Sequence, residues 1–328
     1  MNILYIIGNG LDIAHHMKTS YQDFFQYYLS LSTDDKHILA MKKDIDSHRY
    51  ETWADLEIGM GLYSSQCYEK EVFLKCLDDI KTNLKEYLSK ESDKIPYYGI
   101  SSRSGFINPG LFLDPEPRDT YDRWIRGFQS GTVIDVMTFN YTSTLEYLLG
   151  FKGAPIGLNG TIQLRSIQHV HGTLENMMVM GVNDTSQISN TNFKTDLDVK
   201  EDFVKPEYND ACMNNKNAIC EMLINNADLI VFYGTSLGKS DDKWWKLIGQ
   251  RMGTDKYPLL VYLPYDERKN VTAAPNRLRR WTLGYINEIR NKFDIKIDED
   301  ILARRACVAL NKSLFQITKA PKPITKTK

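Results

Sequence analysis

Four short apolar runs, each followed by a turn of small or polar residues, constrain the fold most strongly. Ile3–Ile7, Val133–Phe139 and Leu229–Tyr233 are rich in β-branched and aromatic residues, and Leu259–Leu263 lies between two prolines. Such runs are typical of strands buried on both faces of a sheet. Because the later runs alternate with helical patterns, the sequence predicts an α/β fold with a Rossmann-like, mainly parallel sheet and helices on both faces.

The stretch between the first two runs is mostly helical. Ser20 and Asp23 resemble a capping box at the start of one helix, and further helical patterns cover Trp53–Leu62 and Tyr68–Leu88. A strand followed by so much helical sequence predicts a large helical insertion after the first strand, at residues 21–125.

The remaining segments complete the predicted domain organisation. Residues 1–20 and 126–317 are expected to form the α/β nucleotide-binding core, with helices at Ala274–Ile289 and Ile301–Leu310. The polar stretch Asp184–Lys216 predicts a long surface loop, a candidate lid. The end of the chain, residues 318–328, is rich in Pro and Lys and is expected to be disordered.

Composition excludes several classes of protein. With 41 basic and 42 acidic residues, the net charge of −1 gives no reason to expect nucleic acid or an anionic membrane as a partner. No apolar stretch reaches the roughly 20 residues that cross a bilayer, and Ile3–Ile7 lacks the basic segment of a signal peptide. The five cysteines form no C-x-x-C pair, so neither a disulfide framework nor a metal site is expected. We expect a cytoplasmic protein.

Polar residues with chemical potential follow the predicted strands. Gly8-Asn9-Gly10-Leu11-Asp12 comes after the first run, where glycines let backbone approach a phosphate or a sugar, although a plain turn explains them too. Asn140 follows the second run, where its amide could face a ligand or simply form a turn. The segment Gly234–Asp241 follows the third run with small and hydroxylated residues, and Ser240 or Asp241 can cap the next helix. In that helix, Trp244 and Trp245 are expected to pack rather than to stack on a base.

A histidine pair, His169 and His171, lies between the second and third runs. Two histidines on one face of an extended chain can ligate a metal, but Zn²⁺ needs a third ligand that the sequence does not offer. His171 precedes Gly172, so it is better explained as a general base beside close backbone. His169 is explained more simply as a structural histidine, which is the commoner role.

In this order the motifs resemble those of the AbiH-type bacteriophage abortive-infection proteins, from Ile3 to Trp245. The resemblance rests on the following segments: Gly8-Asn9-Gly10-Leu11-Asp12, Lys18-Thr19-Ser20-Tyr21, Asp23-Phe24, Trp53-Ala54-Asp55-Leu56-Glu57, Thr138-Phe139-Asn140-Tyr141-Thr142, His169-Val170-His171-Gly172 and Gly234-Thr235-Ser236-Leu237-Gly238.

More distantly, the same order is similar to the sirtuin-like NAD-consuming fold. That similarity implies a phosphate turn at Gly8 and Gly10, a catalytic amide at Asn140 and a catalytic base at His171. The implied adenosine-side ribose loop is Gly234, Thr235 and Ser236, and the implied nucleotide-contacting set also includes Asn9, Asp12, Thr138 and Tyr141.

The chain also departs from the sirtuin pattern. The four-cysteine zinc module is missing, which argues against protein deacylation. Asp12 replaces a small or hydroxylated residue; because a carboxylate repels pyrophosphate, Asp12 is expected to cap a helix or accept from a ribose hydroxyl. Thr142 replaces the acidic residue expected after the asparagine.

The resemblance implies an antiphage NAD⁺ glycohydrolase, with NAD as the substrate and no metal. Asp55 and Glu57 are candidates to complete the site from the helical insertion, unless they lie on a solvated helix face. The alternative is a nucleotide sensor that binds an ADP-ribose-like signal without turnover and controls a separate effector. Because an NAD⁺ hydrolase would harm its own cell, its resting state is expected to be restrained by an autoinhibiting lid at Asp184–Lys216, by a regulatory protein partner or by a homo-oligomer.

Overall fold

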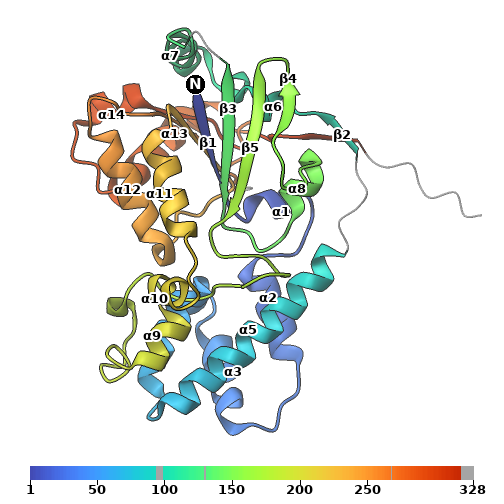
Figure 1. Ribbon diagram of the computed structural model, residues 1–328, viewed down its shortest axis with the longest axis vertical. Coiled ribbons are helices and arrows are strands. Elements are labelled where there is room, and N and C mark those ends of the chain that lie inside the picture. Colours follow the sequence, from blue (N-terminus) through green and yellow to red (C-terminus); the bar gives the residue numbers. More distant parts are fainter. Residues whose placement is uncertain (94–98, 129–130, 267, 319–328) are drawn as a thin grey trace, which may run out of the picture.

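The computed structural model describes residues 1–93, 99–128, 131–266 and 268–318. In this part of the chain seven strands form one sheet, in the order β4-β5-β3-β1-β6-β7-β8 (Figure 1). Neighbouring strands are parallel except β4 and β5, which confirms an α/β fold with a mainly parallel sheet. The strands are β1 (Asn2–Ile7), β3 (Thr132–Thr138), β4 (Ile156–Asn159), β5 (Ile162–His169), β6 (Leu229–Tyr233), β7 (Leu259–Leu263) and β8 (Ala306–Val308).

The predicted apolar runs form the centre of this sheet as β1, β3, β6 and β7. Within β1, Leu4 and Ile6 pack into one hydrophobic cluster, and Ile3, Tyr5 and Ile7 pack into another. Successive side chains of a strand point to opposite faces, so both faces of the sheet are covered.

Different helices cover the two faces. One cluster contains residues of α11 (Lys216–Asn226), α12 (Asp242–Met252), α13 (Leu278–Lys292) and α14 (Glu299–Arg305). The other contains residues of α6 (Ser104–Ile107), α7 (Pro115–Ile125) and α8 (Thr144–Leu149). The helix predicted over Ile301–Leu310 is wrong in its second half, because α14 ends at Arg305 and the chain continues as edge strand β8.

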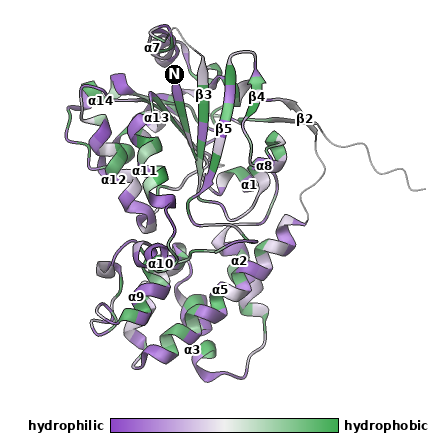
Figure 2. Cartoon of the chain, viewed as in Figure 1, coloured by the Kyte–Doolittle hydropathy of each residue, from purple (hydrophilic) through white to green (hydrophobic). Residues whose placement is uncertain are grey.

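A helical layer lies below the carboxyl ends of the strands in Figure 1. Its first part contains α2 (Tyr21–Ser30), α3 (Lys36–His48), α4 (Leu56–Tyr63) and α5 (Lys70–Ser92). Ser20 caps α2 by accepting a hydrogen bond from the backbone N–H of Asp23, as the capping box predicted. In Figure 2, hydrophobic and hydrophilic residues alternate along α5, whose apolar face is buried in a cluster shared with α2 and α3.

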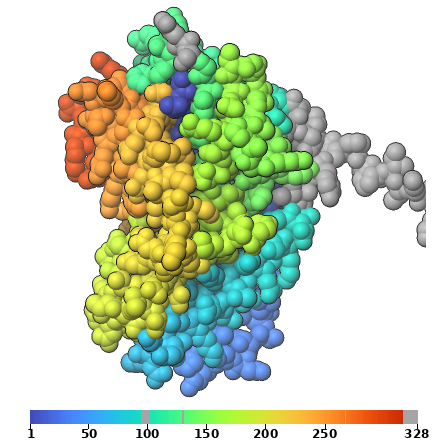
Figure 3. Space-filling view, in the orientation of Figure 1, coloured from blue at the N-terminus to red at the C-terminus, as the bar shows by residue number. Residues whose placement is uncertain are grey.

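A second stretch of chain completes the helical layer and corrects one prediction. Residues 184–216 are not a long loop, because they contain α9 (Leu197–Phe203) and α10 (Lys205–Ala211). Val199 and Phe203 are buried in the same cluster as α2–α5, so this segment is part of a core rather than a lid. Figure 3 shows the yellow-green surface of this stretch beside the blue and cyan surface of the first part.

Helix α1 (Gly10–Ala14) follows β1 and begins at the carboxyl edge of the sheet. The strands β2 (Gly99–Ser102) and β9 (Gln316–Thr318) form a separate antiparallel pair. Of the tail predicted to be disordered, residues 319–328 lie outside the described residues. The described part of the chain contains no helix with the length and apolar character needed to span a bilayer.

Candidate functional site

A pocket of about 790 Å³ lies between the carboxyl edge of the sheet and the helical layer. Its walls include the turns that follow β1, β3, β6 and β7, together with His171 just beyond β5. Tyr21 at the start of α2 and Glu57 on α4 close it from the helical layer. Parallel strands end at the same edge of a sheet, which is why residues far apart in sequence meet here.

Most of the predicted site residues line this pocket. They are Gly8, Asn9, Gly10, Asp12, Asn140, Tyr141, His171, Gly234, Thr235 and Ser236. Thr138 instead lies one layer deeper, where its hydroxyl accepts a hydrogen bond from the backbone N–H of Asn140 (3.2 Å). This hydrogen bond stabilises the turn that contains Asn140.

The glycines of the first turn allow two turns to touch. A Cβ atom on Gly8 would lie 2.7 Å from the carbonyl oxygen of Gly234, and one on Gly10 would lie 2.5 Å from its Cα atom. The N–H of Gly8 donates to the carbonyl of Tyr233, and the N–H of Gly10 to that of Gly234. Both amides are thus used within the protein, and close packing accounts for these glycines.

The Asn140 turn is held in place through His169. The ring of His169 lies with Nδ1 2.8 Å from the carbonyl oxygen of Asn140 and Nε2 2.6 Å from Oε1 of Glu146. These contacts give His169 a structural role, because its ring connects the Asn140 turn to Glu146. The side-chain Oδ1 of Asn140 is buried and has no hydrogen-bond partner among the described residues.

Asp12 is a buried carboxyl group inside the pocket wall. Its Oδ2 accepts a hydrogen bond from the hydroxyl of Thr142 (2.7 Å), whereas its Oδ1 has no partner in the described structure. Burial raises the pKa of Asp12 to about 6, although hydrogen bonding from Thr142, Thr144 and Asn140 opposes that rise. Asp12 therefore titrates near neutral pH.

His171 is held between backbone and a buried carboxylate. Gly172 has a φ of +75°, and a Cβ atom there would lie 1.8 Å from the carbonyl oxygen of Met177, so the backbone beside His171 is closely packed. The Nε2 atom of His171 lies 2.9 Å from Oδ1 of Asp241, an ion-pair distance at which no hydrogen bond is formed in the described structure. Nδ1 is the ring nitrogen that does not face this carboxylate.

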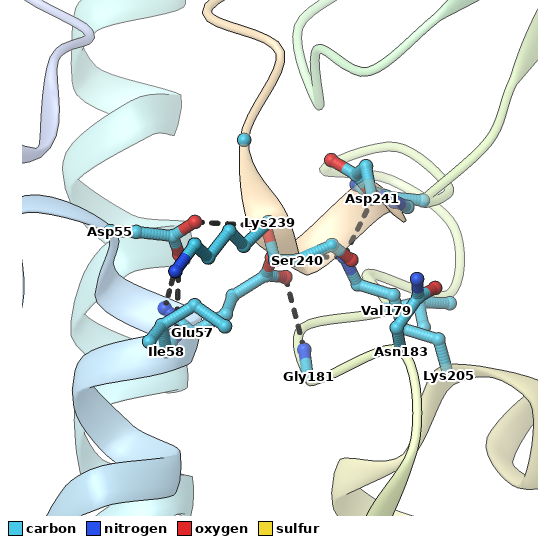
Figure 4. Close-up of polar contacts among 12 residues, drawn as sticks. Asp55, Glu57, Ile58, Val179, Gly181, Asn183, Lys205, Lys239, Ser240 and Asp241 are labelled. Atoms are coloured by element: carbon cyan, nitrogen blue, oxygen red, sulfur yellow. Dashed lines mark hydrogen bonds and ion pairs between the residues drawn. The ribbon is translucent and has the colours of Figure 1, made fainter. Parts of the chain in front are cut away.

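A network of charged side chains continues from Asp241 into the helical layer. Lys205 on α10 places Nζ 3.0 Å from the same Oδ1 atom of Asp241 and 2.9 Å from Oε2 of Glu57. Glu57 also accepts a hydrogen bond from the backbone N–H of Gly181 (3.0 Å). Figure 4 shows these side chains converging from different segments. Glu57 is therefore buried in an ion-pair network and is not on a solvated helix face.

Opposite effects set the protonation of this network. Burial alone would raise the pKa of Asp241, but Lys205 and then His171 hold it well below its usual range. Burial lowers the pKa of Lys205, but Asp241 and Glu57 outweigh it and raise that pKa to about 12. Burial raises the pKa of Glu57, and the charge of Lys205 opposes this rise. The interior thus holds a charged Lys205–Asp241 pair.

Asp241 is free for this network because another residue takes over its capping position. Asp241 occupies the N-cap of α12 but makes no capping hydrogen bond. In the amide orientation that satisfies its neighbours, Asn183 instead accepts from the backbone N–H groups of Asp242 and Lys243. Ser240 donates to Asp55, which itself caps α4, so Asp55 also borders the site.

Sequence reasoning missed Lys205 and the role of Asp241. The sequence indicates Asp241 only as a helix cap, and Lys205 lies in the polar stretch for which it predicts a loop. Trp244 and Trp245 are both buried, and Trp245 stacks on Phe293 while also lining the pocket. No group of three or more His, Cys, Asp or Glu side chains suited to a metal ion occurs in the described ranges.

The fold and the pocket define the class, an α/β protein with a candidate small-molecule site at the carboxyl edge of a mainly parallel sheet. The sequence model of the family described as bacteriophage abortive infection AbiH matches residues 4–262. The chain belongs to this family, which confirms the resemblance drawn from its motifs and indicates a role in abortive infection of bacteriophages. No curated protein matches the sequence.

Proposed function

We propose that this AbiH-family protein is an NAD⁺ glycohydrolase, which acts in antiphage defence by releasing nicotinamide and depleting cellular NAD. The observation that carries the proposal is the meeting of Asn140 and His171 in one pocket, where Asn140 has a buried, unpartnered Oδ1 and His171 faces a buried carboxylate.

The position of the pocket supports a nucleotide ligand. Numbered along the chain, the parallel strands lie in the order 3-2-1-4-5-6, which is the order of Rossmann-type dinucleotide-binding sheets. In such sheets the ligand lies beyond the carboxyl ends of the strands, where the order reverses. That point falls between β1 and β6 here, and the turns at Gly8–Asp12 and Gly234–Ser236 both border the pocket.

Unpartnered oxygens in the pocket wall support a sugar as part of the ligand. Asp12 Oδ1, Asn140 Oδ1 and Thr235 Oγ1 are buried without hydrogen-bond partners in the described structure. Buried polar atoms normally have partners, and ribose hydroxyls are donors that can reach such acceptors when the wall adjusts on binding. The volume of about 790 Å³ falls within the range of about 300–1,000 Å³ that is usual for small-molecule sites.

Cleavage of the bond between ribose and nicotinamide requires few protein groups beyond Asn140 and His171. When the bond between C1′ of the ribose and nicotinamide breaks, its electron pair neutralises the pyridinium nitrogen, so the leaving group needs no proton. Water forms a bond to C1′ and loses a proton to Nδ1 of His171. The amide of Asn140 orients the water or a ribose hydroxyl without adding charge.

The buried charges around His171 favour its action as a base. The carboxylate of Asp241, whose pKa is held low by Lys205 and His171, lies 2.9 Å from Nε2 of His171. Its negative charge stabilises the imidazolium that forms when His171 takes up a proton during the reaction.

The test measures nicotinamide release from NAD⁺ by the purified protein and by its Asn140→Ala and His171→Ala variants. We expect release by the wild type and a loss on the order of 10²–10⁴-fold in the His171 variant. Calorimetric binding of NAD⁺ and ADP-ribose to all of these proteins serves as the control for folding of the pocket.

Undiminished release by both variants would contradict the proposed roles. Tight binding without release, also after addition of extract from infected cells, would favour the sensor that binds an ADP-ribose-like signal and controls another effector. Because uncontrolled loss of NAD is harmful to a cell, we further propose that a regulatory protein or a homo-oligomer restrains the resting enzyme.

A further inference from the structure

Lys205 is a buried cation that the proposed reaction does not itself use. Its Nζ atom lies within 3.0 Å of oxygens of three residues, namely Glu57, Ser240 and Asp241. Its side chain is 7% exposed. Charged lysines are seldom buried, because removing the ammonium group from water is unfavourable unless partners compensate. A lysine held in this way fixes the positions of the oxygens around it.

One oxygen atom links Lys205 to His171. Oδ1 of Asp241 lies 3.0 Å from Nζ of Lys205 and 2.9 Å from Nε2 of His171. The carboxylate cannot turn away from Lys205 without also leaving the imidazole. The orientation of His171 thus depends on a residue of the helical layer.

The carboxylate of Asp241 is not used by the helix that it precedes. Asp241 occupies the N-cap position of α12, where an aspartate side chain usually accepts hydrogen bonds from the first backbone N–H groups of the helix. In this structure Asp241 makes no such bond and faces Lys205 and His171 instead. Asn183 accepts from the first backbone N–H groups of α12 in its place, so the carboxylate of Asp241 is held by its contacts with Lys205 and His171.

We propose that Lys205 is a positioning residue, which holds Asp241 against Nε2 of His171 and thereby presents an unprotonated Nδ1 to the substrate. The inference rests on the proposed base role of His171. It adds that the helical layer, through α10, is required to prepare the base at the carboxyl edge of the sheet.

The test compares Lys205→Met, which removes the cation at similar length, with Lys205→Arg, which keeps it. Lys75→Met is the matched control, because Lys75 pairs with Asp35 at an exposed site away from the pocket. The first readout is the tautomer of the His171 ring, measured by ¹⁵N NMR under alkaline conditions and assigned by comparison with His171→Ala. The second is NAD⁺ turnover, with the binding affinity measured separately.

We expect a proton on Nε2 in the wild type, in Lys75→Met and in Lys205→Arg, and a shift toward the Nδ1 tautomer in Lys205→Met. Because a displacement of about 1 Å costs on the order of 10²-fold in rate, turnover by Lys205→Met should fall by about that factor while NAD⁺ affinity changes less than about threefold. Glu57→Gln leaves Lys205 beside Asp241 and should keep the Nε2 tautomer.

A Lys205→Met variant with the wild-type tautomer would overturn the inference, whatever its turnover. So would equal tautomer shifts in Lys205→Met and Glu57→Gln, which would show a general loss of packing. Should the wild type not hydrolyse NAD⁺, the proposed function fails, whereas the NMR comparison still decides whether Lys205 positions His171.

Discussion

A Cβ atom on Gly10 would lie 2.5 Å from the Cα atom of Gly234, so the turns after β1 and β6 touch backbone to backbone. The N–H of Gly10 donates to the carbonyl of Gly234 (2.8 Å), and Gly234 has a φ of +64°, which favours glycine. This contact brings the two turns together at the floor of the pocket.

Gly10→Ala should therefore destabilise the protein. The added methyl group has no room against a backbone atom, and overpacking of this kind typically costs about 1–3 kcal/mol. Urea denaturation measures the loss. Gly284→Ala is the matched control, because Gly284 lies in α13 with nothing within 4 Å of a Cβ atom, and the change should stabilise the helix by roughly 0.5–1 kcal/mol. Equal stabilities of Gly10→Ala and the wild type would contradict the packing argument.

Asp12→Asn should stabilise the protein at alkaline pH. Because burial raises the pKa of Asp12 to about 6, against about 3.9 in an unfolded chain, the folded state favours the protonated form. The stabilisation from that proton is complete below about pH 4 and is lost as the pH rises through about 6. Above that pH the ionised carboxylate costs the folded state roughly 3 kcal/mol, which the amide avoids.

Thermal unfolding at several pH values tests this expectation. The Tm of Asp12→Asn should exceed that of the wild type above pH 6 and approach it near pH 4. Asp135→Asn provides the contrast, since Asp135 is also buried but pairs with Arg165 (Nε–Oδ1 3.0 Å), so its replacement should lower the Tm at alkaline pH. A Tm difference for Asp12→Asn that does not vary with pH would refute the titration of this group.

The sheet could be predicted well from the sequence where strands are buried on both faces. Runs such as Leu229–Tyr233 contain only large apolar residues, and this composition is sufficient to identify a central strand. β5 was missed because its exposure varies along Ile162–His169, and five of its residues are polar or charged in the sequence IQLRSIQH. Edge strands and short helices depend on neighbours that a local pattern does not contain.

The prediction of a loop over residues 184–216 was wrong for the same reason. α9 and α10 have seven residues each, too few to be stable alone, and they form because Val199 and Phe203 pack against α5. The turns of the site could be predicted because strand ends converge at one edge. Lys205 could not, because its partner Glu57 is 148 positions away and no motif surrounds Lys205.

Arg268→Ala should weaken NAD⁺ binding without affecting catalysis. Arg268 lines the pocket just after β7, and its side chain is 90% exposed, so it can meet the phosphates of a dinucleotide at the rim. Exposed charges contribute modestly, so we expect KM to rise by a few-fold, less at high salt, with kcat unchanged. Hydrolysis of nicotinamide riboside, which has no phosphate, should not change. A similar effect on both substrates would exclude contact between Arg268 and the phosphates.

His169→Ala and His171→Ala should differ in kind, although the residues are two positions apart. Removing His169 leaves the carbonyl of Asn140 and the carboxylate of Glu146 without their ring partner, and each unsatisfied buried group costs about 1–3 kcal/mol. We therefore expect a lower Tm for His169→Ala, with partial turnover per folded molecule at low temperature. His171→Ala should keep a Tm near that of the wild type, because Asp241 retains Lys205, and should lose turnover. The opposite pattern would assign the base to His169.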